Sequence, residues 1–213
     1  MRIRVAILDM KNAVYTVGHS THTIEHFIEI LQQNGVSVVV DVRSSPYSRF
    51  NPQFNRETLA ISLREHDIKY VFLGEEFGAR SSDRSCYING KVQFDRLANT
   101  DLFRSGINRV RLGVERGYRM ALMCAEKDPL DCHRTVLVSR SLEKEGFYVV
   151  HILSDGSTES QSSAIERLVK QFKMHQSDLF LSDSELIEKA FERQEEKIAY
   201  AEEMEISQDG AIQ

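Results

Sequence analysis

Residues 36–40, Val-Ser-Val-Val-Val, most constrain the fold, because they present apolar side chains on both faces of an extended chain. Such a strand is typical of the interior of a parallel sheet, where helices cover both faces. The preceding segment has the i, i+3, i+4, i+7 spacing of an amphipathic helix, on Ile24, Phe27, Ile28 and Leu31. Thr23 is a suitable N-cap for this helix and Gly35 a suitable stop. A helix that leads into a two-sided apolar strand predicts an α/β fold.

The alternation of strand and helix extends over most of the chain. The apolar pattern predicts strands over residues 14–17, 36–40, 68–73, 120–124 and 148–152. It predicts further helices over residues 56–66, 94–97, 102–115 and 128–145, the last with Pro129 at its first position. Residues 74–91 are predicted to be a loop. We expect a three-layer α/β sandwich with a mostly parallel central sheet of about five strands and right-handed crossovers.

The pattern changes after residue 155. Residues 155–163 are small and polar, which predicts a linker. A helix is predicted over residues 164–172, and a second begins at residues 182–185. Residues 156–213 carry 6 Lys and Arg against 13 Asp and Glu. We expect an α/β domain over residues 1–155 and an acidic helical extension over residues 156–213 that is not an independent domain. The extension should pack on the body or on a second copy of the chain in a homodimer, with the last eight residues frayed.

Composition restricts the class of protein. The chain has 213 residues, of which 41% are hydrophobic, enough for one substantial core. No segment approaches the ~18 apolar residues of a membrane span, and the start does not resemble a secretory signal. The three cysteines, Cys86, Cys124 and Cys132, form no C-x-x-C pair and do not suggest a disulfide framework. We therefore expect a cytoplasmic protein in a reducing compartment, without a membrane partner.

Polar and reactive side chains follow the predicted strands. His19 and Ser20 follow the first strand, residues 41–44 the second, residues 74–76 the third and residues 124–126 the fourth. The carboxyl ends of parallel strands meet at one edge of a sheet, where open α/β folds bind their ligands. We therefore expect these segments to surround one pocket.

The residue types in this pocket favour an anionic ligand. Residues 1–155 contain 16 Arg and only 5 Lys, and the planar guanidinium suits phosphate and carboxylate groups. The predicted substrate-binding residues are His19, Ser20, Asp41, Arg43, Ser44, Arg49 and Arg134. Some have simpler explanations: Asp41 could cap a turn, His19 could be a buried turn residue, and the arginines could be ordinary surface residues.

The predicted catalytic residues are Glu126, His133 and Cys132. Cys132 and His133 should lie in the first helical turn after Pro129, where the helix dipole favours a thiolate or a bound anion. Glu126 is a candidate general base, or else the ion-pair partner of an arginine. Cys124 is more simply explained as a small apolar residue. For His151, a place in the core and a place in the pocket are equally good interpretations.

No cofactor or metal is expected. The spacing Cys-x7-Cys-His matches no standard zinc arrangement, and adjacent residues of a helical turn point in diverging directions. The chain contains neither a Gly-x-x-x-x-Gly-Lys loop nor a Gly-x-Gly-x-x-Gly turn. Hydrolysis of nucleoside triphosphates and ordinary dinucleotide binding are therefore disfavoured.

Several motifs together resemble the Domain of Unknown Function 488 family. They are Val-Tyr-Thr-Val-Gly-His-Ser at residues 14–20, Asp-Val-Arg-Ser-Ser-Pro-Tyr-Ser-Arg at residues 41–49, residues 124–127 with Cys-His-Arg at 132–134, and residues 151–152. The resemblance covers residues 14–153, and residues 74–80 depart from the family's leucine-glycine-glycine region. The resemblance implies a compact cytosolic α/β domain from bacteria or archaea. It does not imply any particular activity.

Two functions fit these patterns. The first is an enzyme, a transferase or hydrolase, acting on a phosphorylated or otherwise anionic small molecule such as a nucleotide. The second is a nucleic-acid-associated binding or repair-type module whose arginines contact phosphates, although the acidic extension counts against tight DNA binding. A rhodanese-like sulfur carrier is weaker, because no short anion loop joins Cys124 to an arginine.

Overall fold

A six-stranded sheet forms the centre of the computed structural model, which describes residues 12–173 and 182–202. The strand order is β3-β2-β6-β1-β7-β8. The strands are β1 (Ala13–Gly18), β2 (Val38–Asp41), β3 (Lys69–Phe72), β6 (Met120–Cys124), β7 (Tyr148–Ile152) and β8 (Thr158–Ser160). All neighbours pair in parallel except β8, which is antiparallel to β7. The predicted mostly parallel α/β sheet is confirmed.

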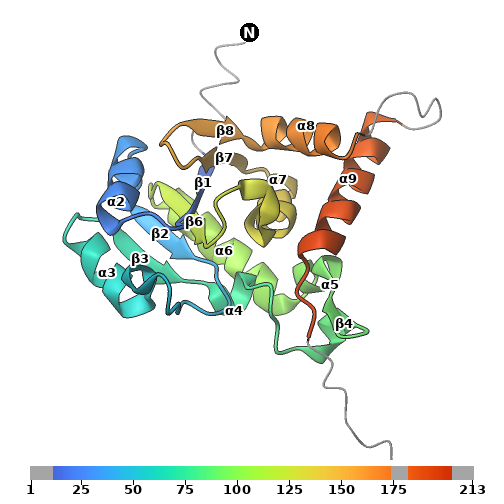
Figure 1. Ribbon diagram of the computed structural model, residues 1–213, viewed down its shortest axis with the longest axis horizontal. Helices are drawn as coiled ribbons and strands as arrows, with labels where there is room; N and C mark the ends of the chain where they lie inside the picture. The colour runs from blue at the N-terminus through green and yellow to red at the C-terminus, as the bar shows by residue number, and fades with distance from the viewer. Residues whose placement is uncertain (1–11, 174–181, 203–213) are drawn as a thin grey trace, which may run out of the picture.

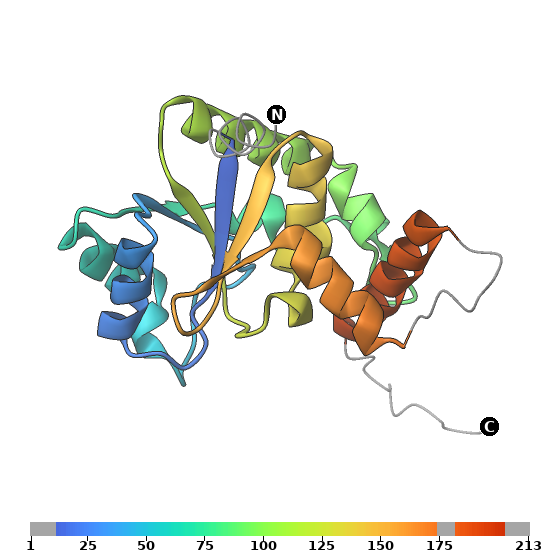
Figure 2. The same ribbon diagram turned by 90° about the horizontal axis from the view of Figure 1, so that it is seen from above.

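Helices cover both faces of this sheet, which gives three layers (Figures 1 and 2). On one face lie α2 (Ile24–Gln33), η1 (Pro52–Phe54) and α3 (Arg56–Arg64). The other face carries α4 (Gly74–Phe77), α5 (Phe94–Ala98), α6 (Asp101–Glu115), η4 (Arg134–Ser139), α7 (Arg140–Lys144), α8 (Gln161–Gln171) and α9 (Asp183–Ile198). Strand β6 shows why both faces are apolar: Leu122 and Cys124 face the second layer of helices, and Ala121 and Met123 face the first.

The predicted helix before the central strand is confirmed in detail. Helix α2 begins after Thr23, whose hydroxyl accepts a hydrogen bond from the backbone N–H of His26 at 3.3 Å. Just beyond its end, Gly35 has a φ of 64°, a conformation that favours glycine. The chain therefore leaves the helix and enters β2 as the sequence pattern indicated.

Two segments that were predicted to be irregular contain regular structure. Residues 74–91 include α4, the turn η2 (Arg84–Cys86) and strand β4 (Tyr87–Ile88), which forms a hairpin with β5 (Lys91–Val92). The predicted linker at residues 155–163 contains β8 and the start of α8. The side chains of β8 are polar because it is an edge strand, and its backbone pairs with β7. The extension therefore continues the sheet.

The single helix predicted over residues 128–145 is wrong. Pro129 begins a short 3-10 turn, η3 (Pro129–Asp131), in which the Asp128 carboxylate accepts from the N–H of Leu130 at 2.9 Å. Cys132 then returns to an extended conformation, with φ −137° and ψ 141°. The continuous helix starts only after His133, as the π-helical segment η4 followed by α7. Cys132 and His133 therefore do not share a helical turn.

The acidic helix α9 packs on the body, one of the two arrangements expected of it. Leu186, Ala190 and Phe191 are buried, and the Gln194 amide donates to the Leu130 carbonyl at 2.8 Å. Figure 1 shows α9 running from α8 toward α5 and the hairpin. Beyond α9, the backbone N–H of Val92 donates to the carbonyl of Tyr200 at 2.9 Å, so the chain lies along β5. A homodimer contact stays a prediction, and the last eight residues lie outside the described range.

Within residues 12–173 and 182–202, no helix is both long and apolar enough to cross a membrane.

Candidate functional site

The carboxyl ends of three adjacent strands lie level with one another. Gly18 of β1 is in register with Cys124 of β6, and Asp41 of β2 is in register with Met123. The pairing continues past the strands, because the backbone N–H of His19 donates to the Cys124 carbonyl at 2.9 Å and that of Val42 donates to the Met123 carbonyl at 3.1 Å. The loops after β1, β2 and β6 therefore lie side by side, as the sequence predicted.

The loop after β6 passes directly over Gly18. A Cβ atom at Gly18 would lie 1.9 Å from the carbonyl oxygen of Glu126 and 2.9 Å from the Nη1 atom of Arg134. That oxygen accepts a hydrogen bond from Arg134 Nη1 at 2.7 Å. Only glycine leaves room for this crossing, so Gly18 and Arg134 together fix the position of Glu126.

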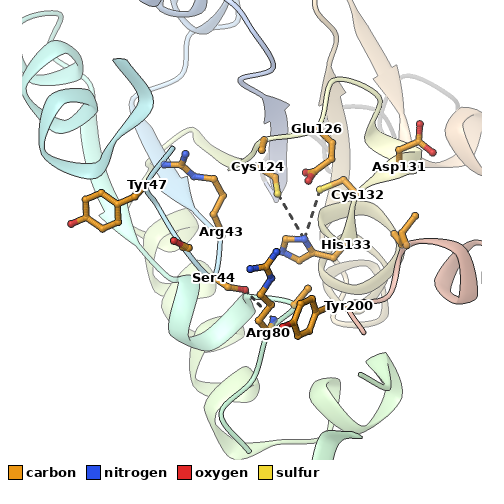
Figure 3. A pocket seen from close by; sticks show the side chains of 14 residues that line it. Arg43, Ser44, Tyr47, Arg80, Cys124, Glu126, Asp131, Cys132, His133 and Tyr200 are labelled. Carbon is orange, nitrogen blue, oxygen red and sulfur yellow. Dashed lines mark hydrogen bonds between the residues drawn. The ribbon is translucent and has the colours of Figure 1, made fainter. Parts of the chain in front are cut away.

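A cavity of about 410 Å³ lies at this edge of the sheet (Figure 3). This volume is within the usual range of small-molecule sites. Its walls come from four parts of the chain: Arg43, Ser44, Ser45 and Tyr47 after β2; Ala79 and Arg80 after α4; residues 124–126 and 131–133 at and beyond the end of β6; and Ile198 and Tyr200 at and beyond the end of α9. Segments far apart in the sequence therefore meet in one hollow.

Arg43 is held by a buried network. Its Nε atom donates to Asp41 Oδ1 at 2.9 Å and its Nη2 atom to Asp41 Oδ2 at 2.6 Å. Nη2 also donates to the Phe54 carbonyl, and the Tyr70 hydroxyl donates to Asp41. Burial is the largest influence on the Arg43 pKa, but the hydrogen bonds and charge of Asp41 outweigh it and raise that pKa. Asp41 therefore orients Arg43 and neutralises its charge.

His19 supports the same arginine. Its ring stacks on Phe54 with centroids 4.3 Å apart, and its Nδ1 atom lies 2.9 Å from the Ser20 carbonyl. This contact assigns the proton to Nδ1 and leaves Nε2 to accept from Arg43 Nη1 at 3.2 Å. Burial, followed by the charge of Arg43, lowers the pKa of His19 to about 4. His19 is therefore neutral and does not line the cavity.

Two thiols and an imidazole meet on the opposite wall. The Nδ1 atom of His133 lies 3.7 Å from the sulfur of Cys124 and 3.8 Å from that of Cys132. His133 Nε2 donates to the Val42 carbonyl at 3.2 Å, so the lone pair of Nδ1 faces both sulfurs. Figure 3 shows the Glu126 carboxylate beside the two sulfurs. The three atoms are of the types that bind transition metals and lie within 4.8 Å of one another.

The environment shifts the protonation of this cluster. Hydrogen bonding with Cys132, reinforced by burial, raises the pKa of Cys124 well above its usual value. Burial acts to raise the pKa of Glu126, but hydrogen bonds from the Cys124 and Cys132 thiols outweigh it and lower that pKa. Burial likewise opposes protonation of His133, yet the neighbouring Cys124 and Glu126 raise its pKa. The carboxylate, the two thiols and the imidazole therefore influence one another's protonation.

Five of the ten predicted site residues lie outside the cavity wall: His19 and Asp41, which hold Arg43, and also Ser20, Arg49 and Arg134. Arg134 is fully buried, and its guanidinium donates to the backbone carbonyls of Glu126 and Lys127. Its role is to hold the loop after β6, in place of the predicted contact with a substrate. Ser20, with a φ of 48°, forms the turn after β1, and Arg49 lies exposed on the loop after β2. For His151 the sequence left both the core and the pocket open, and the structure shows it fully buried in the core.

The structure brings the other five predicted residues to the wall: Arg43, Ser44, Glu126, Cys132 and His133. It also adds Arg80 and Tyr200, which sequence reasoning missed. The Arg80 guanidinium lies 4.5 Å from the centroid of the Tyr200 ring, and the N–H of Arg80 donates to the Ser44 hydroxyl at 3.0 Å. Helix α4 separates Arg80 from the end of β3, and Tyr200 follows a helix, so the rule that placed the other loops does not reach them.

The fold and cavity define an α/β protein whose candidate site lies at the carboxyl ends of a mostly parallel sheet. The sequence profile of the family described as Domain of unknown function DUF488 matches residues 23–141, more than half of the chain, and the chain belongs to that family. The predicted resemblance is confirmed, although two of the motifs, at residues 14–20 and 151–152, lie outside the matched range. Neither the curated proteins nor the solved structures include a match.

Proposed function

We propose that the protein is an enzyme that binds a phosphorylated or otherwise anionic small molecule in this cavity and transfers or hydrolyses its anionic group. The supporting observation is that one wall carries cationic and N–H donors while the other carries a carboxylate, an imidazole and two thiols. Donors hold a negative charge, and proton-accepting groups within the same hollow can act on a bound substrate.

The donor wall centres on Arg80. Among residues 12–173 and 182–202, no carboxylate forms an ion pair with Arg80, whereas Asp41 neutralises Arg43. Arg43 uses four of its five N–H donors within the protein, which leaves one on Nη1. The backbone N–H groups of Ser44 and Ser45 donate to no acceptor in those same ranges. An anion can therefore find several donors along a short stretch of wall.

The opposite wall supplies the reactive groups. Glu126, fixed in place by Gly18 and Arg134, is suited to accept a proton from an attacking group. His133 is oriented by its hydrogen bond to Val42, and the Cys132 sulfur lies beside it. We therefore propose proton transfer by Glu126 and His133 and chemistry at Cys132. All three groups line the same cavity.

Ligand-dependent thermal stability tests the proposal. Sulfate, inorganic phosphate, nucleotides and sugar phosphates should raise the melting temperature, and saturation at a hundred times Kd would contribute about 2.7 kcal/mol. Arg80→Ala should lose this response, since it removes the charged donor without disturbing a buried group. Arg49→Ala is the matched control, because Arg49 is also exposed but does not line the cavity. Equal responses in wild type and Arg80→Ala would refute the proposal.

A nucleic-acid function is supported by one separate observation. Beside Arg49, Phe50 is 89% exposed and Tyr47 is 56% exposed, and exposed aromatic rings next to arginine can stack on unpaired bases. This alternative predicts binding of single-stranded DNA or RNA with a steep salt dependence, weakened by Phe50→Ala. A response to small anions that Phe50→Ala leaves unchanged would favour the enzyme.

A further inference from the structure

The spacing of three ligand atoms in the cavity wall suggests a metal centre. In a tetrahedral zinc site, with Zn–S near 2.3 Å and Zn–N near 2.0 Å, neighbouring sulfur and nitrogen ligands lie about 3.5 Å apart. The two observed sulfur to Nδ1 distances are 3.7 and 3.8 Å. The two sulfurs lie within 4.8 Å of each other, against about 3.8 Å in such a site, so shifts of at most about 1 Å would bring all three atoms to bonding distance from one ion.

Hydrogen bonding alone explains only part of this arrangement. The neutral His133 ring has one lone pair on Nδ1, which can accept a proton from one thiol at a time. Yet both sulfurs lie at nearly the same distance from that nitrogen. A cation that contacts all three atoms accounts for the symmetry, because it replaces the thiol protons and uses both sulfurs equally.

The surroundings of the three ligands are those of a prepared site. The Nε2 atom of His133 donates to the Val42 carbonyl, an outer contact that metal-binding histidines commonly make and that fixes the tautomer. The backbone N–H of Arg134 donates to the Cys132 sulfur at 3.4 Å, which fixes the position of that sulfur. Both contacts hold the ligands in place before any ion binds.

The backbone explains how two adjacent residues can bind the same ion. Residues in one helical turn diverge, and that expectation argued against a metal in the sequence. In the structure Cys132 is extended and His133 precedes the first turn of η4, so both side chains turn toward Cys124 at the end of β6. The geometric objection to a metal site therefore does not apply to this chain.

We propose that Cys124, Cys132 and His133 bind a zinc ion whose fourth coordination position opens into the cavity. Two sulfurs and one imidazole suit zinc and disfavour magnesium and calcium, which prefer oxygen. Three protein ligands with an open position are typical of catalytic zinc, and Glu126 lies beside the sulfurs. This inference rests on the proposed function in one respect only. The fourth coordination position would hold an oxygen of the anionic substrate or a water molecule.

Metal titration of the reduced, full-length protein tests this inference. We expect one zinc ion per chain, measured by elemental analysis after dialysis and by competition with a chelator. Cobalt in place of zinc should give sulfur-to-metal charge-transfer absorption and the visible bands of a tetrahedral ion. Cys124→Ser and Cys132→Ser should each weaken zinc binding at least tenfold. Cys86→Ser is the matched control, because Cys86 is also buried but lies apart from the three ligands.

The cobalt spectrum of the wild type keeps the test independent of whether the serine variants fold. A reduced wild-type chain that binds no zinc and gives no charge-transfer band would overturn the inference, as would zinc binding that survives both serine substitutions. The two proposals can fail separately. Arg80→Ala should lose anion binding and keep zinc. A wild-type protein that binds zinc but no anion would leave this inference standing and refute the proposed enzyme.

Discussion

Asp41 and Arg43 show what a single residue contributes to this molecule. Asp41 is fully buried and Arg43 is 6% exposed, and they share two direct hydrogen bonds between their side chains. The pair places Arg43 at the cavity wall and also adds a stability requirement, because removing one partner leaves a charge buried without compensation.

Asp41→Asn should therefore destabilise the protein by roughly 3–5 kcal/mol, since the buried guanidinium keeps its charge and loses its counter-charge. Urea unfolding, monitored by circular dichroism, measures the change. Arg49→Ala, an exposed substitution in the same loop, should change stability by less than about 0.5 kcal/mol. A loss below about 1 kcal/mol for Asp41→Asn would show that the pair is not a stabilising element.

His151 makes stability depend on pH. Its Nδ1 atom accepts from the Thr16 hydroxyl at 2.8 Å and its Nε2 atom donates to Gln161 Oε1 at 2.7 Å, so the neutral ring is fully used. Burial, followed by the charge of Arg134, lowers the pKa of His151 to about 3. The unfolded chain, with a histidine pKa near 6.5, therefore binds more protons between these two values.

The stability that His151 contributes should be fully present above about pH 6.5 and should fall as the pH drops toward 3, by up to ~1.4 kcal/mol per pH unit. Urea unfolding at pH 7.5, 6.5, 5.5 and 4.5 measures this slope. His151→Gln should reduce the slope by about one proton, because the amide does not titrate. Identical slopes for both proteins would contradict the assignment.

At the scale of the element, the turn between β6 and η4 decides the geometry of the site. Gly18→Ala should displace the Glu126 carbonyl, because the added Cβ would lie 1.9 Å from it. We expect loss of the response to anions and destabilisation of at least about 1 kcal/mol. Gly117→Ala is the control, because a Cβ atom added there meets no atom within 4 Å. This substitution should lower the free energy of unfolding by about 1 kcal/mol, through the φ of 81°, and leave ligand binding unchanged.

The same turn shows where the sequence could predict structure and where it could not. Strands β6 and β7 matched their predicted bounds, and α2 matched its cap and stop, because each is defined by local patterns of apolar residues. The break at Cys132 has no such signal, since Pro129 fits both a helix start and a 3-10 turn. The predicted helix start at Pro129 also made Arg134 look like a ligand for anions. Only the fold reveals that its guanidinium donates to backbone carbonyls.

At the scale of the whole molecule, the acidic extension completes the cavity wall. The sequence predicted that this extension packs on the body or on a second copy, but not that it brings Ile198 and Tyr200 to a site formed mainly by the strand-end loops. Long-range placement of this kind cannot be predicted from periodicity, which describes only neighbouring residues. The predicted rim of strand-end loops was therefore incomplete on one side.

Tyr200→Ala should weaken anion binding about two- to fivefold, because the ring positions Arg80 and an exposed cation–π contact contributes about 0.5–1 kcal/mol. Titration calorimetry with sulfate or a nucleotide measures the change. Tyr200→Phe keeps the ring and should bind as the wild type does. If the alanine variant binds equally well, Arg80 does not depend on the ring for its position.

The pairing of residues 200–202 with the hairpin has a consequence for biosynthesis. The backbone of Val92 bonds to Tyr200, and Glu202 bonds to Gly90, so this wall forms only after residue 202 has left the ribosome. A nascent chain can assemble the sheet through β7 while its pocket still lacks one side. The wall that carries Tyr200 is therefore expected to be the last part of the cavity to form during synthesis.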